Sequence, residues 1–183
     1  MSWALQRHPE SRGGADLAVE VELARPQPSS LRLRYAVLGQ IAGLRLPPAA
    51  PPERTDGLWR STCFEAFLRG PHGGYFEFNF APSSQWAAYA FQDYRAGMAP
   101  VEPFERPRME RRAQACRYEL DVELALDRLL DRPGAAPWRV GLSAVLEDAA
   151  GGISYWALSH PPGKPDFHHP DSFALDLPAT EPR

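Results

Sequence analysis

The sequence predicts an all-β fold, an antiparallel β-sandwich of the jelly-roll kind with nine or more strands and little helix. Apolar and polar residues alternate with a period of two along many short segments, which is the pattern of strands with two unlike faces. Gly and Pro occur 14 and 20 times and cluster between these segments, where they indicate turns. Short strands separated by such turns are typical of sandwiches and jelly rolls.

The chain has the length of one domain, since 183 residues suffice to enclose a hydrophobic core. We expect residues 1–16 to form a poorly ordered lead-in and residues 17–183 to form a single sandwich domain. The Pro-rich segment 47–52 is expected to run extended over the surface. It does not divide the domain, because neither flank alone could cover both hydrophobic faces of its strands.

Alternation predicts several strands in the first half of the chain. Their ranges are 17–24, 31–38, 61–68, 75–80 and 86–91, and a short strand is expected at 39–46. The turn residues 70–74 are expected to join 61–68 and 75–80 as an antiparallel hairpin. A short helix competes with the strand at 86–91, because Ala is common there and two serines precede it.

The second half of the chain combines strands with Pro-rich loops. Irregular loops are expected at 97–108 and 161–170. Strands are predicted at 116–126, 138–147, 153–160 and 172–177, and one helical turn is predicted at 126–130. The Gly-rich turn 148–152 is expected to pair the strands on either side of it as a second hairpin.

Charge and cysteine content exclude several classes of partner. The net charge is −3, Lys164 is the single lysine and no basic stripe forms, so nucleic acid is not an expected partner. No stretch approaches the length needed to span a membrane, and residues 1–16 lack the apolar run of a signal peptide. We therefore expect a cytoplasmic protein with free thiols at Cys63 and Cys116. The sequence leaves the oligomeric state open.

The central candidate site follows from the strand at 75–80. If Phe76, Phe78 and Phe80 face the core, Glu77 and Asn79 point the other way together with Tyr75. Glu65 lies on the facing strand, so that two carboxylates come close and require a cation, an Arg, an array of sugar hydroxyls or a shared proton. An outer face in which Arg60, Arg69 or Arg95 neutralises these acids is an equal alternative.

Aromatic side chains and one loop complete the candidate site. Trp59 and Trp86 are candidate stacking walls, and the segment 155–171 gathers Tyr, Trp, His, Asp and the single Lys. The predicted ligand-binding residues are Trp59, Glu65, Tyr75, Glu77, Asn79, Trp86, Trp156, His160 and Lys164. No catalytic residue is assigned, because the sequence has no P-loop, nucleophile elbow or HExxH motif.

A metal site is the alternative interpretation of the same loop. His160 and His168, with Asp166 or Asp171, are residue types that bind zinc. Without an HxH or HxxxH pattern on a regular element, the loop favours imidazoles that bond to backbone groups, and no metal ligand is assigned.

Several motifs resemble the bacterial DOMON-like domain proteins, which are related to carbohydrate-binding module family 9. They read DGLW from Asp56, TCFEAF from Thr62, YFEFNFAPS from Tyr75, WAAY from Trp86 and YWALSHP from Tyr155. The resemblance covers most of the chain from about residue 17. It implies a β-sandwich with a ligand site for a sugar, or for haem in some relatives, and a fold-level resemblance carries the fold further than the function.

The sequence therefore predicts a non-catalytic module that binds a small molecule, a carbohydrate or a sugar derivative. Two alternatives remain open. A sugar hydrolase or isomerase would use the same acids with His160 or His168, and a haem protein would use Met98 and His160. Calcium among the acids is also left open.

Overall fold

The structure, a computed structural model, describes residues 1–14, 16–71, 73–127, 129 and 137–178. Within these residues, twelve strands form one antiparallel sheet, and the helical residues are confined to three short 3-10 helices. This confirms the predicted all-β fold with little helix. No helix in the described ranges has both the length and the apolar character needed to cross a membrane.

The elements follow one another along the chain in this order. They are β1 Ser2–Arg7, β2 Ala18–Gln27, β3 Ser30–Leu38, η1 Ile41–Gly43, η2 Leu58–Arg60, β4 Cys63–Arg69, β5 Tyr75–Phe80, β6 Trp86–Phe91, β7 Ala99–Pro100, β8 Arg108–Gln114, β9 Arg117–Ala125, β10 Trp138–Glu147, β11 Ile153–Ala157, η3 Pro170–Ser172 and β12 Leu175–Leu177. The strand order from edge to edge is β7-β6-β5-β4-β10-β11-β1-β2-β3-β9-β8, with β12 added to β10.

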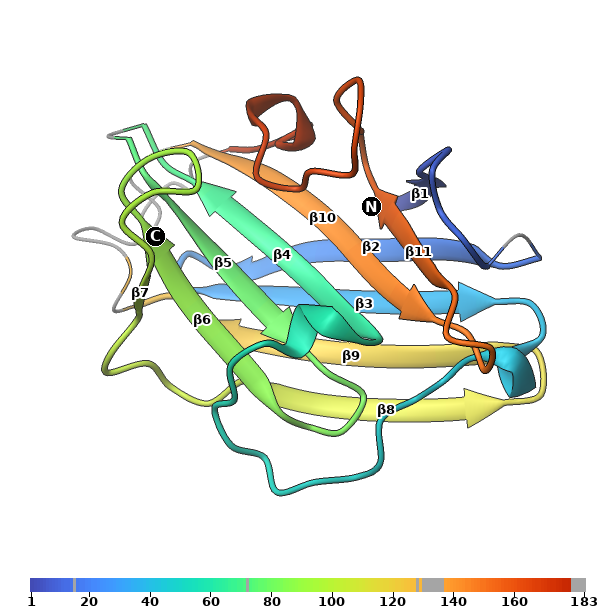
Figure 1. Ribbon diagram of the computed structural model, residues 1–183. Coiled ribbons are helices and arrows are strands. Elements are labelled where there is room, and N and C mark those ends of the chain that lie inside the picture. Colours follow the sequence, from blue (N-terminus) through green and yellow to red (C-terminus); the bar gives the residue numbers. More distant parts are fainter. Residues whose placement is uncertain (15, 72, 128, 130–136, 179–183) are drawn as a thin grey trace.

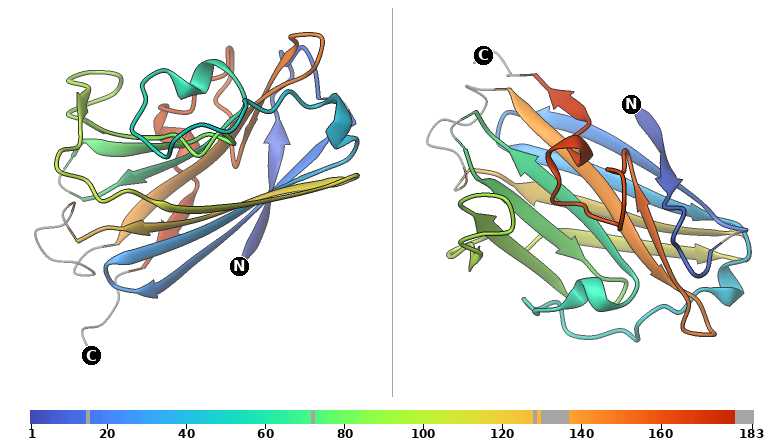
Figure 2. Two further views of the ribbon diagram at one scale, coloured as in Figure 1. Left: turned by 90° about the horizontal axis from the view of Figure 1, so that it is seen from below. Right: turned by 45° about the horizontal axis from the view of Figure 1, so that its top comes forward.

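The sheet folds over on itself and forms the two layers of a sandwich (Figures 1 and 2). Strand β1 joins the layers, because it pairs with β11 at Gln6 and Arg7 and with β2 along Ser2 to Leu5. One layer contains β4, β5, β6, β10 and β11, and the other contains β2, β3, β8 and β9. The main hydrophobic core lies between the layers and includes Leu33, Phe64 and Phe78.

The strands β4, β5, β6 and β10 carry buried residues on both faces. On β4, Phe64 and Leu68 belong to the main core, whereas Cys63 and Phe67 belong to a second hydrophobic cluster on the outer face. Loop residues, including Phe167 and Phe173, pack on this outer face. The outer cluster encloses the site described below.

The two predicted hairpins are confirmed, since β4 pairs with β5 and β10 pairs with β11 in antiparallel register. The strand prediction at 86–91 is also confirmed, because β6 pairs along its whole length with β5. Strand pairing satisfies the backbone donors and acceptors of this Ala-rich segment, so its helix propensity does not decide the outcome.

Four expectations are wrong, and one strand was not predicted. The expected loop at 97–108 contains the two-residue strand β7. Residues 2–7 of the expected lead-in form β1, and the expected strand at 39–46 contains the 3-10 helix η1. The segment 108–114 forms the edge strand β8, which the sequence did not predict because most of its residues are exposed on both faces. The predicted strand at 172–177 begins only at Leu175. The helical turn predicted at 126–130 lies partly outside the described residues.

Candidate functional site

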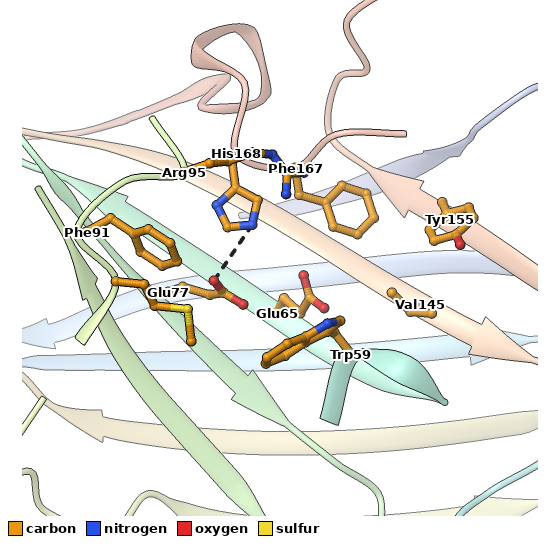
Figure 3. Close-up of a pocket in the computed structure, with 10 residues that line it drawn as sticks. Trp59, Glu65, Glu77, Phe91, Arg95, Val145, Tyr155, Phe167 and His168 are labelled. Atoms are coloured by element: carbon orange, nitrogen blue, oxygen red, sulfur yellow. Dashed lines mark ion pairs between the residues drawn. The ribbon is translucent and has the colours of Figure 1, made fainter. Parts of the chain in front are cut away.

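A pocket of about 370 Å³ lies on the outer face of the layer that contains β4, β5 and β10 (Figure 3). Glu65 on β4, Glu77 on β5 and Val145 on β10 form its floor, and the loop after β11 covers it. The complete lining is Trp59, Glu65, Glu77, Phe91, Arg95, Met98, Val145, Tyr155, Phe167 and His168. Strands thus supply the acids, and loops supply most of the cover.

The register of β4 and β5 brings the two acids together. Glu65 pairs with Asn79, and Phe67 pairs with Glu77, so Glu65 and Glu77 are diagonal neighbours on one face. Phe78 and Phe80 face the main core, as the alternation of 75–80 predicts. The acids are not on a solvated outer face, however: Glu65 is 2% exposed and Glu77 is 5% exposed.

Each buried carboxyl group has one hydrogen bond from the protein. Asn79 Nδ2 donates to Glu77 Oε1 at 2.8 Å, and Ser143 Oγ donates to Glu65 Oε2 at 3.4 Å. Burial raises the pKa of Glu65 well above its ordinary value, the negative charge of Glu77 raises it further, and Ser143 opposes both. Burial also raises the pKa of Glu77, although Asn79 and Arg95 oppose that shift. Both acids therefore keep their protons to a higher pH than a solvated carboxyl group.

His168 lies above Glu77, and its ring is held by Tyr75. The backbone N–H of Arg95 donates to Tyr75 Oη at 3.2 Å, and that hydroxyl lies 2.7 Å from His168 Nδ1. When the Tyr75 hydroxyl donates to Nδ1, the ring proton resides on Nε2, which is 3.8 Å from Glu77 Oε2 (Figure 3). Burial lowers the pKa of His168 to about 4, and the Arg95 charge adds to the effect. His168 is therefore neutral at neutral pH.

Asp166 joins the two loops that cover the pocket. Its Oδ1 accepts hydrogen bonds from Arg95 Nη2 at 2.7 Å and from the His168 backbone N–H at 3.1 Å. Its Oδ2 accepts from the Tyr94 hydroxyl. The Arg95 guanidinium is thus already paired with Asp166, and these contacts hold both loops in place.

Aromatic rings line the pocket beside the acids. Trp59 is 36% exposed, and its ring meets Tyr89 edge-on with centroids 6.0 Å apart. Tyr155 and Phe167 meet edge-on at 6.3 Å. Aromatic faces next to buried polar groups suit a ligand with both C–H faces and hydroxyl groups.

Five of the nine predicted site residues lie at this pocket. Trp59, Glu65 and Glu77 line it, whereas Tyr75 and Asn79 hydrogen-bond to residues that line it. Arg95, which the sequence offers only as a partner for the acids, bonds through its guanidinium to Asp166 instead.

The other four predicted residues do not line the pocket. Trp86 and Trp156 are buried in the main core on the opposite face of the layer. Trp86 cannot face Trp59 across a ligand, because it pairs with Phe80, and paired residues share a face of the sheet. Trp156 Nε1 donates to Ser154 Oγ at 2.9 Å. His160 Nε2 bonds to the Gln6 carbonyl, and Lys164 is exposed.

Of the two candidate haem ligands, Met98 lines the pocket and His160 does not, and the His160 ring packs against His8 with ring centroids 4.8 Å apart. Across the described part of the chain, no three or more His, Cys, Asp or Glu side chains gather in a group suited to a metal ion.

Sequence analysis did not name Phe91, Val145 or Phe167 as site residues. Alternation carried a signal for two of them, since Phe91 shares a face of β6 with Tyr89, and Val145 shares a face of β10 with Ser143. The place of Phe167 depends on how a long loop folds back over the sheet, and strand periodicity carries no information about that path.

Comparison with solved structures finds the same fold in carbohydrate-binding proteins. A candidate carbohydrate-binding protein from Bacteroides uniformis has a TM-score of 0.64 and 13% identity, covering 92% of this chain and 83% of that chain. Family 9 carbohydrate-binding modules from Caldicellulosiruptor kristjanssonii are also similar.

The module solved with glucose has a TM-score of 0.50 and 8% identity over 87% of this chain and 76% of that one. The module solved with cellotriose has a TM-score of 0.53 and 8% identity over 87% of this chain and 74% of that one. No protein-family model matches the sequence, and no curated protein matches it. At these low sequence identities, the structural similarity establishes the fold.

Proposed function

We propose that this protein binds a carbohydrate, without catalysis, in the pocket above Glu65 and Glu77. The observation that carries the proposal is a pocket that combines two buried acids with the rings of Trp59, Tyr155 and Phe167. Its volume of about 370 Å³ falls within the range usual for small-molecule sites, roughly 300 to 1,000 Å³.

One oxygen of each acid lacks a hydrogen bond from the described residues. Glu65 Oε1 is buried without a partner among them, and Glu77 Oε2 is 3.8 Å from His168 Nε2, beyond hydrogen-bonding distance. Sugar hydroxyl groups both donate and accept, so they suit a carboxyl group in either protonation state. The aromatic rings supply apolar surface for the C–H faces of a sugar.

The structural neighbours support this choice of ligand, because their names or bound ligands associate the same fold with saccharides. Membership of the DOMON-like group is part of the proposal and is supported by the motifs around Glu65 and Glu77. Fold-level likeness supports a carbohydrate ligand only by analogy, so the site itself carries the argument.

A glycosidase needs one carboxyl group protonated and the other ionised. In this pocket, burial raises the pKa of both Glu65 and Glu77, whereas Asn79 and Arg95 oppose the shift at Glu77. Release of free sugar from cellotriose is the measurement that distinguishes hydrolysis from binding.

Isothermal titration calorimetry with glucose, cellotriose and galactose tests the proposal. We expect at least one saccharide to bind, and we expect Trp59→Ala and Glu77→Gln each to weaken binding by about tenfold or more. Glu110→Gln, an exposed change on β8 in the other layer, is the matched control and should bind as the wild type does.

Two results would contradict the proposal. One is the absence of binding to every saccharide tested, and the other is equal affinity in the wild type, Trp59→Ala and Glu77→Gln. Release of free sugar from cellotriose that stops in Glu77→Gln would instead establish the hydrolase alternative.

A further inference from the structure

Within the part of the chain that the structure describes, the hydrogen-bond donors to the acids on the pocket floor are the neutral side chains of Asn79 and Ser143. Glu65 lines the pocket and is 98% buried, and its Oε1 has no hydrogen-bond partner among the residues that the structure describes (Figure 3). A buried acceptor without a partner costs about 1 to 3 kcal/mol, and native proteins seldom leave one without a ligand or water in reach. This orphaned oxygen indicates a group that the bound ligand supplies.

The charged and titratable groups around the pocket do not neutralise these acids. His168 is neutral at neutral pH, and Arg95 forms its ion pair with Asp166. Four further titratable groups beside the acids have raised pKa values and carry no positive charge, namely Tyr35, Cys63, Tyr75 and Tyr89. If the acids ionise, the positive charge that offsets them therefore has to come with the ligand.

We propose that the saccharide bound here is an amino sugar, whose primary ammonium group bonds to Glu65 Oε1 and Glu77 Oε2. This inference rests on the proposed carbohydrate function and specifies the ligand class of the same pocket. An ammonium group has three N–H donors, which suits two carboxylate oxygens on one floor. Charge-assisted hydrogen bonds are about twice as strong as neutral ones.

Binding of the ammonium group is coupled to proton release. In the empty pocket burial favours the protonated form of both acids, because it disfavours their charge. When the cation enters, the O–H bond of a carboxyl group breaks, its proton passes to the buffer, and the ligand remains an ammonium ion. A neutral sugar does not supply this charge and leaves the acids protonated.

Calorimetric titration of the wild-type protein with three matched sugars tests this inference. The probes are glucosamine, glucose and N-acetylglucosamine, used at neutral pH and equal ionic strength. We expect glucosamine to bind at least about tenfold more tightly than the other two, which corresponds to about 1.4 kcal/mol. The released proton is taken up by the buffer, and phosphate and Tris differ in their enthalpy of protonation. The measured heat of glucosamine binding should therefore differ between the two buffers.

Substitutions of the two acids then test whether they cause the preference for glucosamine. Glu65→Gln and Glu77→Gln should each reduce the preference for glucosamine over glucose, whereas Glu110→Gln on the other layer should keep it. Gln is nearly isosteric with Glu, so both variants are expected to fold, and urea unfolding curves of the two variants check this. If one variant does not fold, the other still tests the inference.

The outcomes separate this inference from the proposed function. If glucose or N-acetylglucosamine binds as tightly as glucosamine, the ammonium inference is overturned and carbohydrate binding stands. A glucosamine preference that both pocket variants keep also overturns it. If no saccharide binds, both proposals fall.

Discussion

The carboxyl group of Glu65 shows how a single residue couples this fold to pH. It is buried, and burial raises its pKa in the folded chain above the ordinary 4.5. The folded state therefore holds this proton more tightly than the unfolded state does. Below pH 4.5 both states are protonated, and above it the free energy of unfolding falls as the pH rises towards the folded-state pKa.

Glu65→Gln removes this titration. The variant is expected to gain stability over the wild type as the pH rises above 4.5. The gain is about 1.4 kcal/mol for each pH unit over which the folded wild type keeps the proton. Urea unfolding of both proteins across a pH series measures the difference, and a gap that is independent of pH would contradict the account.

The effect of His168 on the pH dependence of stability is opposite in sign to that of Glu65. Its folded-state pKa falls from the ordinary 6.5 to about 4, so the folded chain binds a proton less tightly than the unfolded chain. Its contribution to stability is complete above pH 6.5 and is lost as the pH falls towards 4. Between pH 6.5 and pH 4, the free energy of unfolding of His168→Gln should therefore fall by roughly 3 kcal/mol less than that of the wild type. Urea unfolding of both proteins across a pH series measures the difference. If the free energy of unfolding has the same pH dependence in the wild type and in His168→Gln, the explanation is wrong.

At the scale of elements, β10 organises the pocket side of the molecule. It pairs with β4, β11 and β12, and its outer face carries Ser143 and Val145 at the pocket. Gly141 lies on the same face, and a Cβ atom there would approach the Ser172 carbonyl oxygen at 3.0 Å. Glycine thus lets η3, next to Phe167 and His168, lie close to the strand.

Gly141→Ala should push η3 away from β10. We expect a loss of about 1 to 3 kcal/mol in the free energy of unfolding and weaker saccharide binding, because the loop that covers the pocket is displaced. Gly43→Ala in η1 is the matched control, since its Cβ would meet nothing within 4 Å. It should change stability by no more than about 0.5 kcal/mol. Equal effects of the two substitutions would contradict the close approach.

The same elements show how far the sequence could predict the fold. The strands at 75–80 and 138–147 are found with their bounds, because their two faces differ clearly in the apolar residues they carry. Strand β8 was missed, since an exposed edge strand has no buried face to impose alternation. At the site, alternation placed Glu65 and Glu77 together and could also have placed Trp86 in the core.

At the scale of the whole molecule, the pocket lies outside the sandwich core. Loops that are distant in sequence, at 92–98 and 158–173, cover the outer face of one layer and bury the acids that lie on it. Periodicity reports which residues share a face, but it does not report which loop covers that face. The burial of the acids was therefore beyond what the sequence could predict.

The two layers depend on β1, which joins them. Leu5 is its buried residue, and Leu5→Ala should cost about 2 to 5 kcal/mol in the free energy of unfolding. Gln6→Ala, an exposed change in the same strand, should cost no more than about 0.5 kcal/mol. Urea unfolding compares them. If Leu5→Ala is as harmless as Gln6→Ala, then β1 does not pack between the layers as described.

The most direct measurement is a crystal structure of the protein soaked with glucose. We expect a sugar ring in the pocket that Trp59 lines, with a hydroxyl group within hydrogen-bonding distance of Glu65 Oε1. A sugar bound only elsewhere on the molecule, or an empty pocket at a concentration that saturates the protein in calorimetry, would contradict it.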